Sequence, residues 1–109
     1  MQKPTLPEPI AAYFDADQHD GRAVAECFAP DGCVRDESKA YSGIAEIKAW
    51  KDASSAKYTY VAQPRTVETL DRSYIVTSEV SGNFPGSPVD LRYTFVLERG
   101  KIASLEIAP

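Results

Sequence analysis

The sequence changes its residue types near position 57, and this change limits the folds that the chain can adopt. Of the fourteen alanines, eleven lie in residues 8–56, whereas residues 57–109 hold fourteen valine, isoleucine and threonine residues against five in residues 8–56. Alanine favours helices, and β-branched residues favour strands. We therefore expect helices first and strands afterwards, which is an α+β order rather than an alternation of strands and helices.

Apolar residues at helical spacing predict a first helix over about residues 7–18. Ile10, Tyr13 and Phe14 lie at positions i, i+3 and i+4, so they form one apolar stripe. Asp17 continues this stripe at i+7, where an acidic residue is unusual. Its side chain either enters the interior or lies in solvent at the end of the helix, and solvent is the simpler interpretation.

Two further helices are expected before the change in composition. Asp20 is a good N-cap residue for a second helix, which should end at the turn residues 30–32. Residues 33–36 then indicate a short strand. A third helix should run from residue 43 or 44 to about residue 54, with its inner side formed by Ile44, Ile47 and Trp50.

Strand-forming residues dominate the second half of the chain. Extended segments are expected over residues 58–70, 73–82, 89–98 and 101–107, with turns rich in Gly, Pro, Asn and Asp between them. Pro64 inside the first of these segments indicates an edge strand or a bulge. Short connections make consecutive strands antiparallel neighbours.

Length and composition exclude several classes of protein. Residues 1–109 fit a single domain, in which residues 1–6 are expected to be a flexible N-terminus. Twelve basic and sixteen acidic residues give a net charge of −4, which is unfavourable for a protein that binds nucleic acid. No apolar run approaches the ~20 residues of a membrane span. The N-terminus resembles no secretory signal, so the expected location is cytoplasmic.

Few residues are available for metal binding or for nucleophilic catalysis. One histidine, His19, and two cysteines, Cys27 and Cys33, are too few for a zinc site. A single histidine also makes serine- or cysteine-based triads improbable. We therefore expect no metal and no cofactor, and any chemistry would depend on carboxylates and tyrosines.

The order of elements and four local motifs resemble the NTF2-like superfamily, and within it the SnoaL-like and ketosteroid-isomerase-like small proteins. The motifs are Ala12–Phe14, Asp20–Gly32, Val34–Asp36 and Tyr41–Ile47, and the resemblance covers residues 8–108. It implies a cone-shaped α+β fold, in which three N-terminal helices pack on a curved mixed or antiparallel sheet of four to five strands. It also implies an apolar pocket for a small apolar molecule, and a homodimer formed through the outer face of the sheet.

The resemblance assigns roles to three residues. Asp36 stands at the position of the base that moves a proton, and loss of hydration at an apolar wall would raise its pKa and improve it as a base. Tyr13 stands where similar proteins carry a tyrosine that donates to the developing oxyanion. Where ketosteroid isomerases carry a second, protonated acid, this sequence has Tyr93, or Thr94 if the register slips by one. This departure argues against ketosteroid isomerisation itself.

Further residues are expected to line the pocket, namely Phe14, Asp17, Val34, Trp50, Tyr60, Leu91 and Phe95. Simpler structural interpretations exist for these positions. Asp36 could be a strand-end residue in water, Tyr13 and Tyr93 could be ordinary packing residues, and aromatic side chains belong to cores more often than to ligand sites.

Two functions from different classes remain open. One is a cofactor-free isomerase or cyclase, in which Asp36 moves a proton next to the carbonyl of a small hydrophobic compound while Tyr13, with Tyr93, stabilises the enolate. The other is a non-catalytic module that binds a small molecule or serves dimerisation. An epoxide hydrolase would need an Asp–Arg–Asp arrangement, and Arg92 lies on the opposite strand face from Tyr93. The position of His19 argues against a His–Asp dyad.

Overall fold

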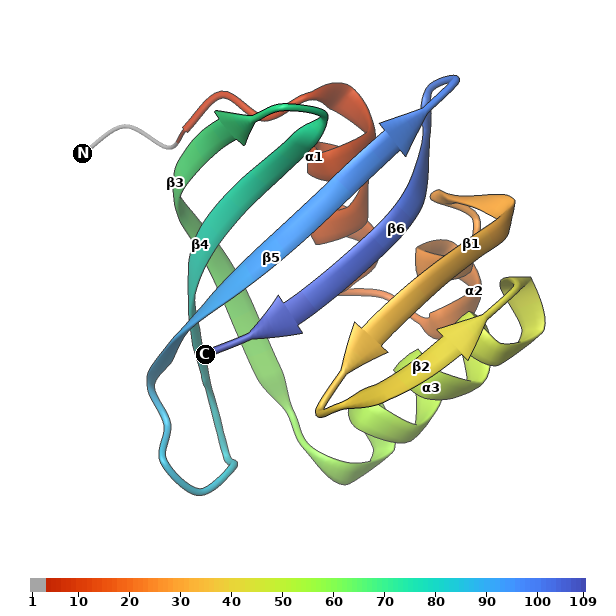
Figure 1. Cartoon of the computed structure of the whole chain (residues 1–109). Helices are drawn as coiled ribbons and strands as arrows, with labels where there is room; N and C mark the ends of the chain where they lie inside the picture. Colours follow the sequence, from red (N-terminus) through yellow and green to blue (C-terminus); the bar gives the residue numbers. More distant parts are fainter. Residues whose placement is uncertain (1–3) are drawn as a thin grey trace.

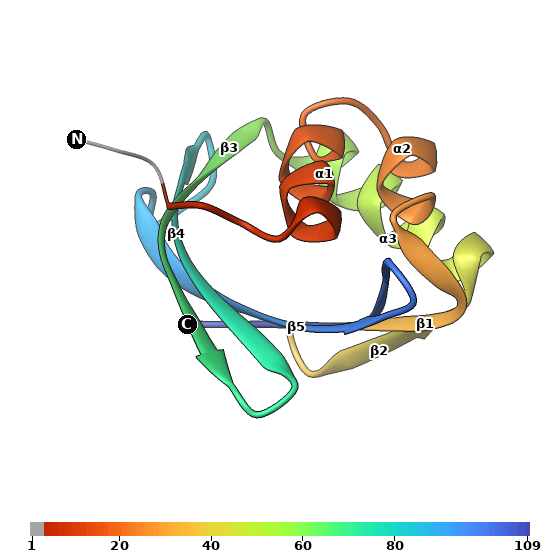
Figure 2. The ribbon, with the colours of Figure 1, turned by 90° about the horizontal axis from the view of Figure 1, so that it is seen from above.

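A curved six-stranded sheet carries three helices on one of its faces (Figures 1 and 2). The computed structural model describes residues 4–109. The helices are α1 (Glu8–Ala16), α2 (Gly21–Ala25) and α3 (Ile44–Lys57). The strands are β1 (Phe28–Asp36), β2 (Lys39–Ser42), β3 (Tyr60–Leu70), β4 (Ser73–Gly82), β5 (Val89–Glu98) and β6 (Lys101–Ala108). The α+β class predicted from the composition is confirmed.

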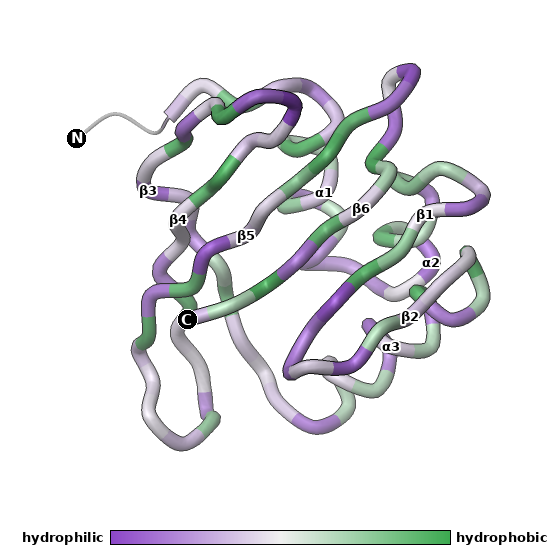
Figure 3. Tube along the Cα trace, in the orientation of Figure 1, coloured by the Kyte–Doolittle hydropathy of each residue, from purple (hydrophilic) through white to green (hydrophobic). Residues whose placement is uncertain are grey.

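The sheet is mixed, with the strand order β2-β1-β6-β5-β4-β3. β3 to β6 form the antiparallel meander that the short connections predict, and β1 joins β6 in parallel. Pro64 lies in the edge strand β3, next to a register shift, as its position in the sequence indicates. Hydrophobic stretches lie along β5 and β6, whereas the turn that joins them is hydrophilic (Figure 3).

The expected count of four to five strands is wrong, because β2 is a sixth strand that the sequence pattern does not indicate. In addition, β1 is longer than predicted. The chain stays extended through the turn-type residues 29–32, which bulge between the pairs Phe28–Ile102 and Cys33–Ser104. The second helix is correspondingly short and ends at Ala25. Glu37 and Ser38 form the tight turn into β2 with φ of 53° and 66°. Such turns usually contain Asn or Gly, so the hairpin had no sequence signal.

The core lies between the helices and the inner face of the sheet. Tyr13 and Phe14 of α1 pack edge-to-face against sheet residues, with ring centroids 5.4 Å apart for Tyr13–Phe95 and 5.1 Å apart for Phe14–Tyr93. In α3, Ile47 and Trp50 are buried, but Ile44 is 39% exposed, so its expected place on the inner side is wrong. As the first residue of the helix, Ile44 lies beyond the edge of the core.

Part of the expected flexible N-terminus, residues 1–3, lies outside the described residues. Leu6 is partly buried and packs against the core. Within residues 4–109, no helix combines the length and the apolar character that a membrane crossing requires.

Candidate functional site

The register of the sheet places Asp36 and Tyr93 in one row across its inner face. Asp36 pairs with Ile107 of β6, and Ile107 pairs with Tyr93 of β5. Two strand spacings separate Asp36 from Tyr93, so their Cα atoms lie about 10 Å apart. Paired residues of neighbouring strands point to the same face, and both side chains therefore enter the space under the helices. Arg92 is exposed on the opposite face.

A cavity of about 490 Å³, termed the cone cavity, opens at this row. Helices α1 and α3 and strands β1, β3, β4, β5 and β6 all contribute to its wall, as does the turn between β4 and β5. Its apolar lining includes Val80, Val89, Leu91 and Ile107. Its polar lining includes Tyr13, Asp36, Trp50, Tyr60 and Tyr93. Glu37, Ser54, Lys57 and Tyr58 line it as well. The cavity therefore joins an apolar wall to several polar and charged groups, a combination that can hold and orient a small molecule.

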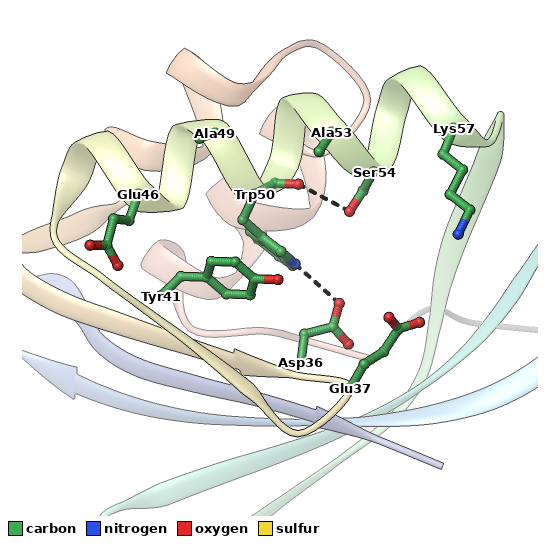
Figure 4. Close-up of a pocket in the computed structure, with 9 residues that line it drawn as sticks. All are labelled: Asp36, Glu37, Tyr41, Glu46, Ala49, Trp50, Ala53, Ser54 and Lys57. Atoms are coloured by element: carbon green, nitrogen blue, oxygen red, sulfur yellow. Dashed lines mark hydrogen bonds between the residues drawn. The ribbon is translucent and has the colours of Figure 1, made fainter.

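Trp50 fixes the carboxylate of Asp36. The indole Nε1 donates a hydrogen bond to Asp36 Oδ2 at 3.0 Å, so the two side chains meet between α3 and β1 (Figure 4). Partial burial raises the pKa of Asp36, the hydrogen bond from Trp50 opposes this effect, and the negative charge of Glu37 raises the pKa further. The net result is a raised pKa, which makes Asp36 a stronger base than an aspartate in water.

Tyr13 and Tyr93 present phenols to the same cavity. Burial raises the pKa of both hydroxyls above the ordinary value, and the charge of Asp17 raises them further. The charge of Asp36 contributes to both shifts, so the carboxylate and the two phenols influence one another. Both phenols therefore stay protonated near neutral pH and can donate hydrogen bonds.

A buried ion pair lies behind the cavity wall. The Nζ atom of Lys51 is 2.7 Å from Asp17 Oδ1, and the two side chains are only 2% and 6% exposed. Lys51 also donates a hydrogen bond to the Tyr60 hydroxyl at 2.8 Å, and this hydroxyl donates to Asp17 Oδ1 at 3.3 Å. These three residues are termed the Asp17–Lys51–Tyr60 triad.

The triad corrects the interpretation of Asp17 and adds a residue that the sequence analysis missed. Asp17 is buried, so a place in solvent at the helix end is wrong. The missed residue is Lys51, which directly follows Trp50 and lies four residues after Ile47 in α3, on the buried side of the helix. An acid on an apolar stripe needs a buried cation as its partner. This requirement could have indicated a buried partner for Asp17, although it does not identify which lysine or arginine that partner is.

Comparison with solved structures gives the family. A protein from Sinorhizobium meliloti, described as a "putative polyketide cyclase", has 43% identical residues and a TM-score of 0.89, with 94% of each chain covered. An NTF2-like protein from Cytophaga hutchinsonii has a TM-score of 0.74 at 13% identity, covering 98% of this chain and 90% of the other. The chain belongs to the family of this Sinorhizobium meliloti protein, and its fold is NTF2-like.

A further solved structure shares this fold at low sequence identity. A protein from Catenulispora acidiphila with a ketosteroid isomerase-like fold, solved in complex with trimethylamine, has a TM-score of 0.84 at 18% identity. The match covers 96% of this chain and 87% of the other, and at this identity it shows the fold alone. No protein-family model matches the sequence, and no curated protein matches it.

Three of the residues expected at the NTF2-like pocket line the cone cavity, namely Trp50, Tyr60 and Leu91. Asp17 does not line it and reaches it only through Tyr60.

Three others, Phe14, Val34 and Phe95, pack in the core instead. Val34 pairs with Leu105 and Leu105 with Phe95, so Val34 and Phe95 lie one row away from Asp36 and Tyr93. That row packs under the aromatic residues of α1, and Val34 and Phe95 are fully buried there. The alternation along the strands correctly predicts the sheet face of Val34 and Phe95. The packing of α1 determines which row of that face lines the cavity.

A second pocket of about 360 Å³ lies beside the cone cavity in this NTF2-like chain, between α3 and the β1–β2 hairpin (Figure 4). Its lining includes Tyr41, whose ring centroid is 6.2 Å from that of Trp50. Asp36 and Trp50 line both spaces. Their hydrogen bond therefore stands at the boundary between the two.

Proposed function

We propose that this chain is a cofactor-free isomerase or cyclase that acts on a small hydrophobic carbonyl compound in the cone cavity. One observation carries the proposal: a carboxylate with a raised pKa, Asp36, shares one apolar cavity with the protonated phenols of Tyr13 and Tyr93. A base and hydrogen-bond donors in one cavity are the groups that enolate chemistry needs.

Asp36 takes a proton from the carbon next to the carbonyl group. The electron pair of the broken C–H bond forms the enolate, and its negative charge moves to the carbonyl oxygen. In an isomerase the proton returns to another carbon of the conjugated system. In a cyclase the enolate carbon attacks a second carbonyl of the same molecule. The π electron pair of that carbonyl moves to its oxygen, which takes the proton from Asp36. The raised pKa of Asp36 reduces the mismatch between this weak base and a weakly acidic carbon.

Tyr13 and Tyr93 stabilise the enolate oxygen. A phenol that donates to this oxygen binds charge that develops only in the transition state, and such a group accelerates the reaction. Burial holds both phenols in their protonated form, so each has a hydrogen to donate. The apolar residues of the wall lower the local dielectric constant, which strengthens these hydrogen bonds.

The description of the Sinorhizobium meliloti relative supports the cyclase branch of this proposal. Polyketide chains carry carbonyl groups on alternating carbons, and the carbon between two carbonyls is unusually acidic. Ring closure of such a chain begins with removal of that proton, which is the step assigned to Asp36.

Exchange of carbon-bound hydrogen tests the proposal without knowledge of the natural substrate. A panel of enolisable ketones, including 4-phenylbut-3-en-2-one and aromatic β-diketones, is incubated in D₂O, and deuterium incorporation is followed by NMR. We expect catalysed exchange by the wild type and a loss of about 100-fold or more in Asp36→Asn. Asp90→Asn, on the exposed face of β5, is the matched control and should exchange normally. Ketone binding without exchange in wild type would favour the non-catalytic binding module.

We also propose that the chain forms a homodimer through the outer face of the sheet. Partly buried Ile75 and Val96 lie on this face beside Thr77 and Thr94, a mixture of apolar and polar groups that suits an interface. Sedimentation equilibrium should give about twice the monomer mass of 11.9 kDa. A single species at the monomer mass would refute the dimer.

A further inference from the structure

Two buried charges, Lys51 and Asp17, have no part in the proton transfer described above. Lys51 is 1% exposed although it carries an ammonium group, and Asp17 is its partner at the C-terminal end of α1. A buried ion pair is seldom more stabilising than apolar residues of the same size, because both charges lose their hydration. Stability alone therefore gives no reason for this pair.

Tyr60 connects the ion pair to the cone cavity. Its hydroxyl accepts a hydrogen bond from Lys51 at 2.8 Å. Tyr60 is also the member of the triad that lines the cavity. The ammonium group of Lys51 also lies 4.6 Å from the centroid of the Tyr60 ring. Lys51 thus fixes the position of the ring and occupies an acceptor site of the phenol oxygen.

The hydrogen of the Tyr60 hydroxyl is weakly held. Its acceptor, Asp17 Oδ1, is 3.3 Å away, whereas good O–H···O hydrogen bonds span 2.5–3.0 Å. The same carboxylate oxygen is 2.7 Å from Lys51. If the Tyr60 hydrogen turns to a ligand, Asp17 therefore keeps its cation and no buried charge is left unpaired.

We propose that Tyr60 donates a hydrogen bond to a carbonyl oxygen of the ligand in the cone cavity, and that Lys51 and Asp17 are positioning residues that hold its hydroxyl for this purpose. The inference rests on the proposed function for the chemical class of the ligand, a hydrophobic carbonyl compound. It adds a third phenol to Tyr13 and Tyr93, and this phenol has a cation behind it. A ligand with two carbonyl oxygens would use both sets of donors.

The carbonyl stretching band of a bound ketone tests the contact at equilibrium. The probe is 4-phenylbut-3-en-2-one with ¹³C at the carbonyl carbon, and difference infrared spectra give the band of the bound form. A hydrogen bond to the carbonyl lowers its frequency. We expect the bound band at lower frequency in wild type than in Tyr60→Phe, together with a three- to ten-fold weaker binding by the variant. Tyr74→Phe removes a phenol of β4 that does not line the cavity, and it should leave the band unchanged.

The double variant Asp17→Asn/Lys51→Met tests the positioning residues. It removes both charges together, so no single buried charge remains, and it retains Tyr60. We expect the carbonyl band to move part of the way towards its position in Tyr60→Phe, which a purely structural role would not produce. If circular dichroism shows that the double variant is unfolded, the comparison of Tyr60→Phe with Tyr74→Phe decides alone.

Two results overturn the inference: an identical band and affinity in wild type and Tyr60→Phe, or no binding of the ketone to wild type at millimolar concentration. The measurement requires no turnover, so it is independent of the hydrogen-exchange assay. Failed exchange with a band shift that depends on Tyr60 would refute the catalytic function and retain this contact. Hydrogen exchange that depends on Asp36, without a band shift that depends on Tyr60, would retain the catalytic function and refute this contact.

Discussion

The indole Nε1 of Trp50 and the carboxylate Oδ2 of Asp36 are 3.0 Å apart, and this hydrogen bond joins α3 to the last residue of β1. It lowers a pKa that burial has raised. Trp50 therefore limits how strong a base Asp36 becomes, while it also fixes the direction of the carboxylate.

Replacement of Trp50 by Phe should raise the pKa of Asp36 further, because the hydrogen bond that favours the carboxylate is lost. Asp36 acts as a base only when it is deprotonated, so activity falls as the pH is lowered through its pKa. In Trp50→Phe this fall should begin at higher pH, and the variant should lose about 1–2 kcal/mol of stability. The pH dependence of hydrogen exchange measures the shift. An acidic limb at the wild-type pH would show that the bond has no electrostatic role.

Asp36→Asn should unfold at higher denaturant concentration than wild type at pH 7, although it loses activity. The raised pKa means that the folded state disfavours the carboxylate relative to the unfolded chain. This cost is absent below the unfolded-state pKa, appears as pH rises through the folded-state pKa, and is complete at pH 7. The expected gain is about 0.5 kcal/mol, measured by urea unfolding. It should vanish at acidic pH, and a gain that is independent of pH would contradict the explanation.

Tyr93→Phe should reduce α-proton exchange by about 100-fold, the typical effect of losing one oxyanion donor. The ring packs against Phe14 with centroids 5.1 Å apart, and phenylalanine keeps this contact. The thermal midpoint should therefore change little. Tyr74→Phe, on the neighbouring strand β4, serves as a control of the same chemistry. Equal rates in wild type and Tyr93→Phe would assign the oxyanion to other donors.

Lys51→Met should destabilise the fold by about 3–5 kcal/mol, because it leaves the buried carboxylate of Asp17 without its cation. Asp17→Asn/Lys51→Met should recover most of this loss, since no buried charge remains. A double-mutant cycle of urea unfolding free energies measures the coupling between the two residues. Additive effects would mean that the two charges do not stabilise each other.

The sequence predicts the sheet better than the site, because the sheet depends on local patterns. Alternation in residues 89–98 puts Tyr93 on the inner face, and the motif around Asp36 puts the acid at a strand end; both expectations agree with the register. Patterns of this kind repeat every two residues, so they give the face of a side chain. They do not tell which row the helices cover, and for this reason Phe95 was expected in the pocket.

The triad could not be predicted because its members are far apart in the sequence. Asp17, Lys51 and Tyr60 come from α1, α3 and β3, and each has an ordinary local interpretation at the end of a helix, on a polar helix or in a strand. Only the meeting of the three elements gives Asp17 its partner. The β1–β2 hairpin was missed for another reason, since Glu37 and Ser38 adopt positive φ without the residues that normally indicate it.

The row that joins Asp36, Ile107 and Tyr93 makes the chemistry of this chain sensitive to insertions and deletions. A deletion of one residue in β5 before Tyr93 would turn the phenol to the outer face and bring Thr94 into the cavity. Single-residue changes of strand length could therefore alter the reaction of such a protein without any substitution among its cavity residues.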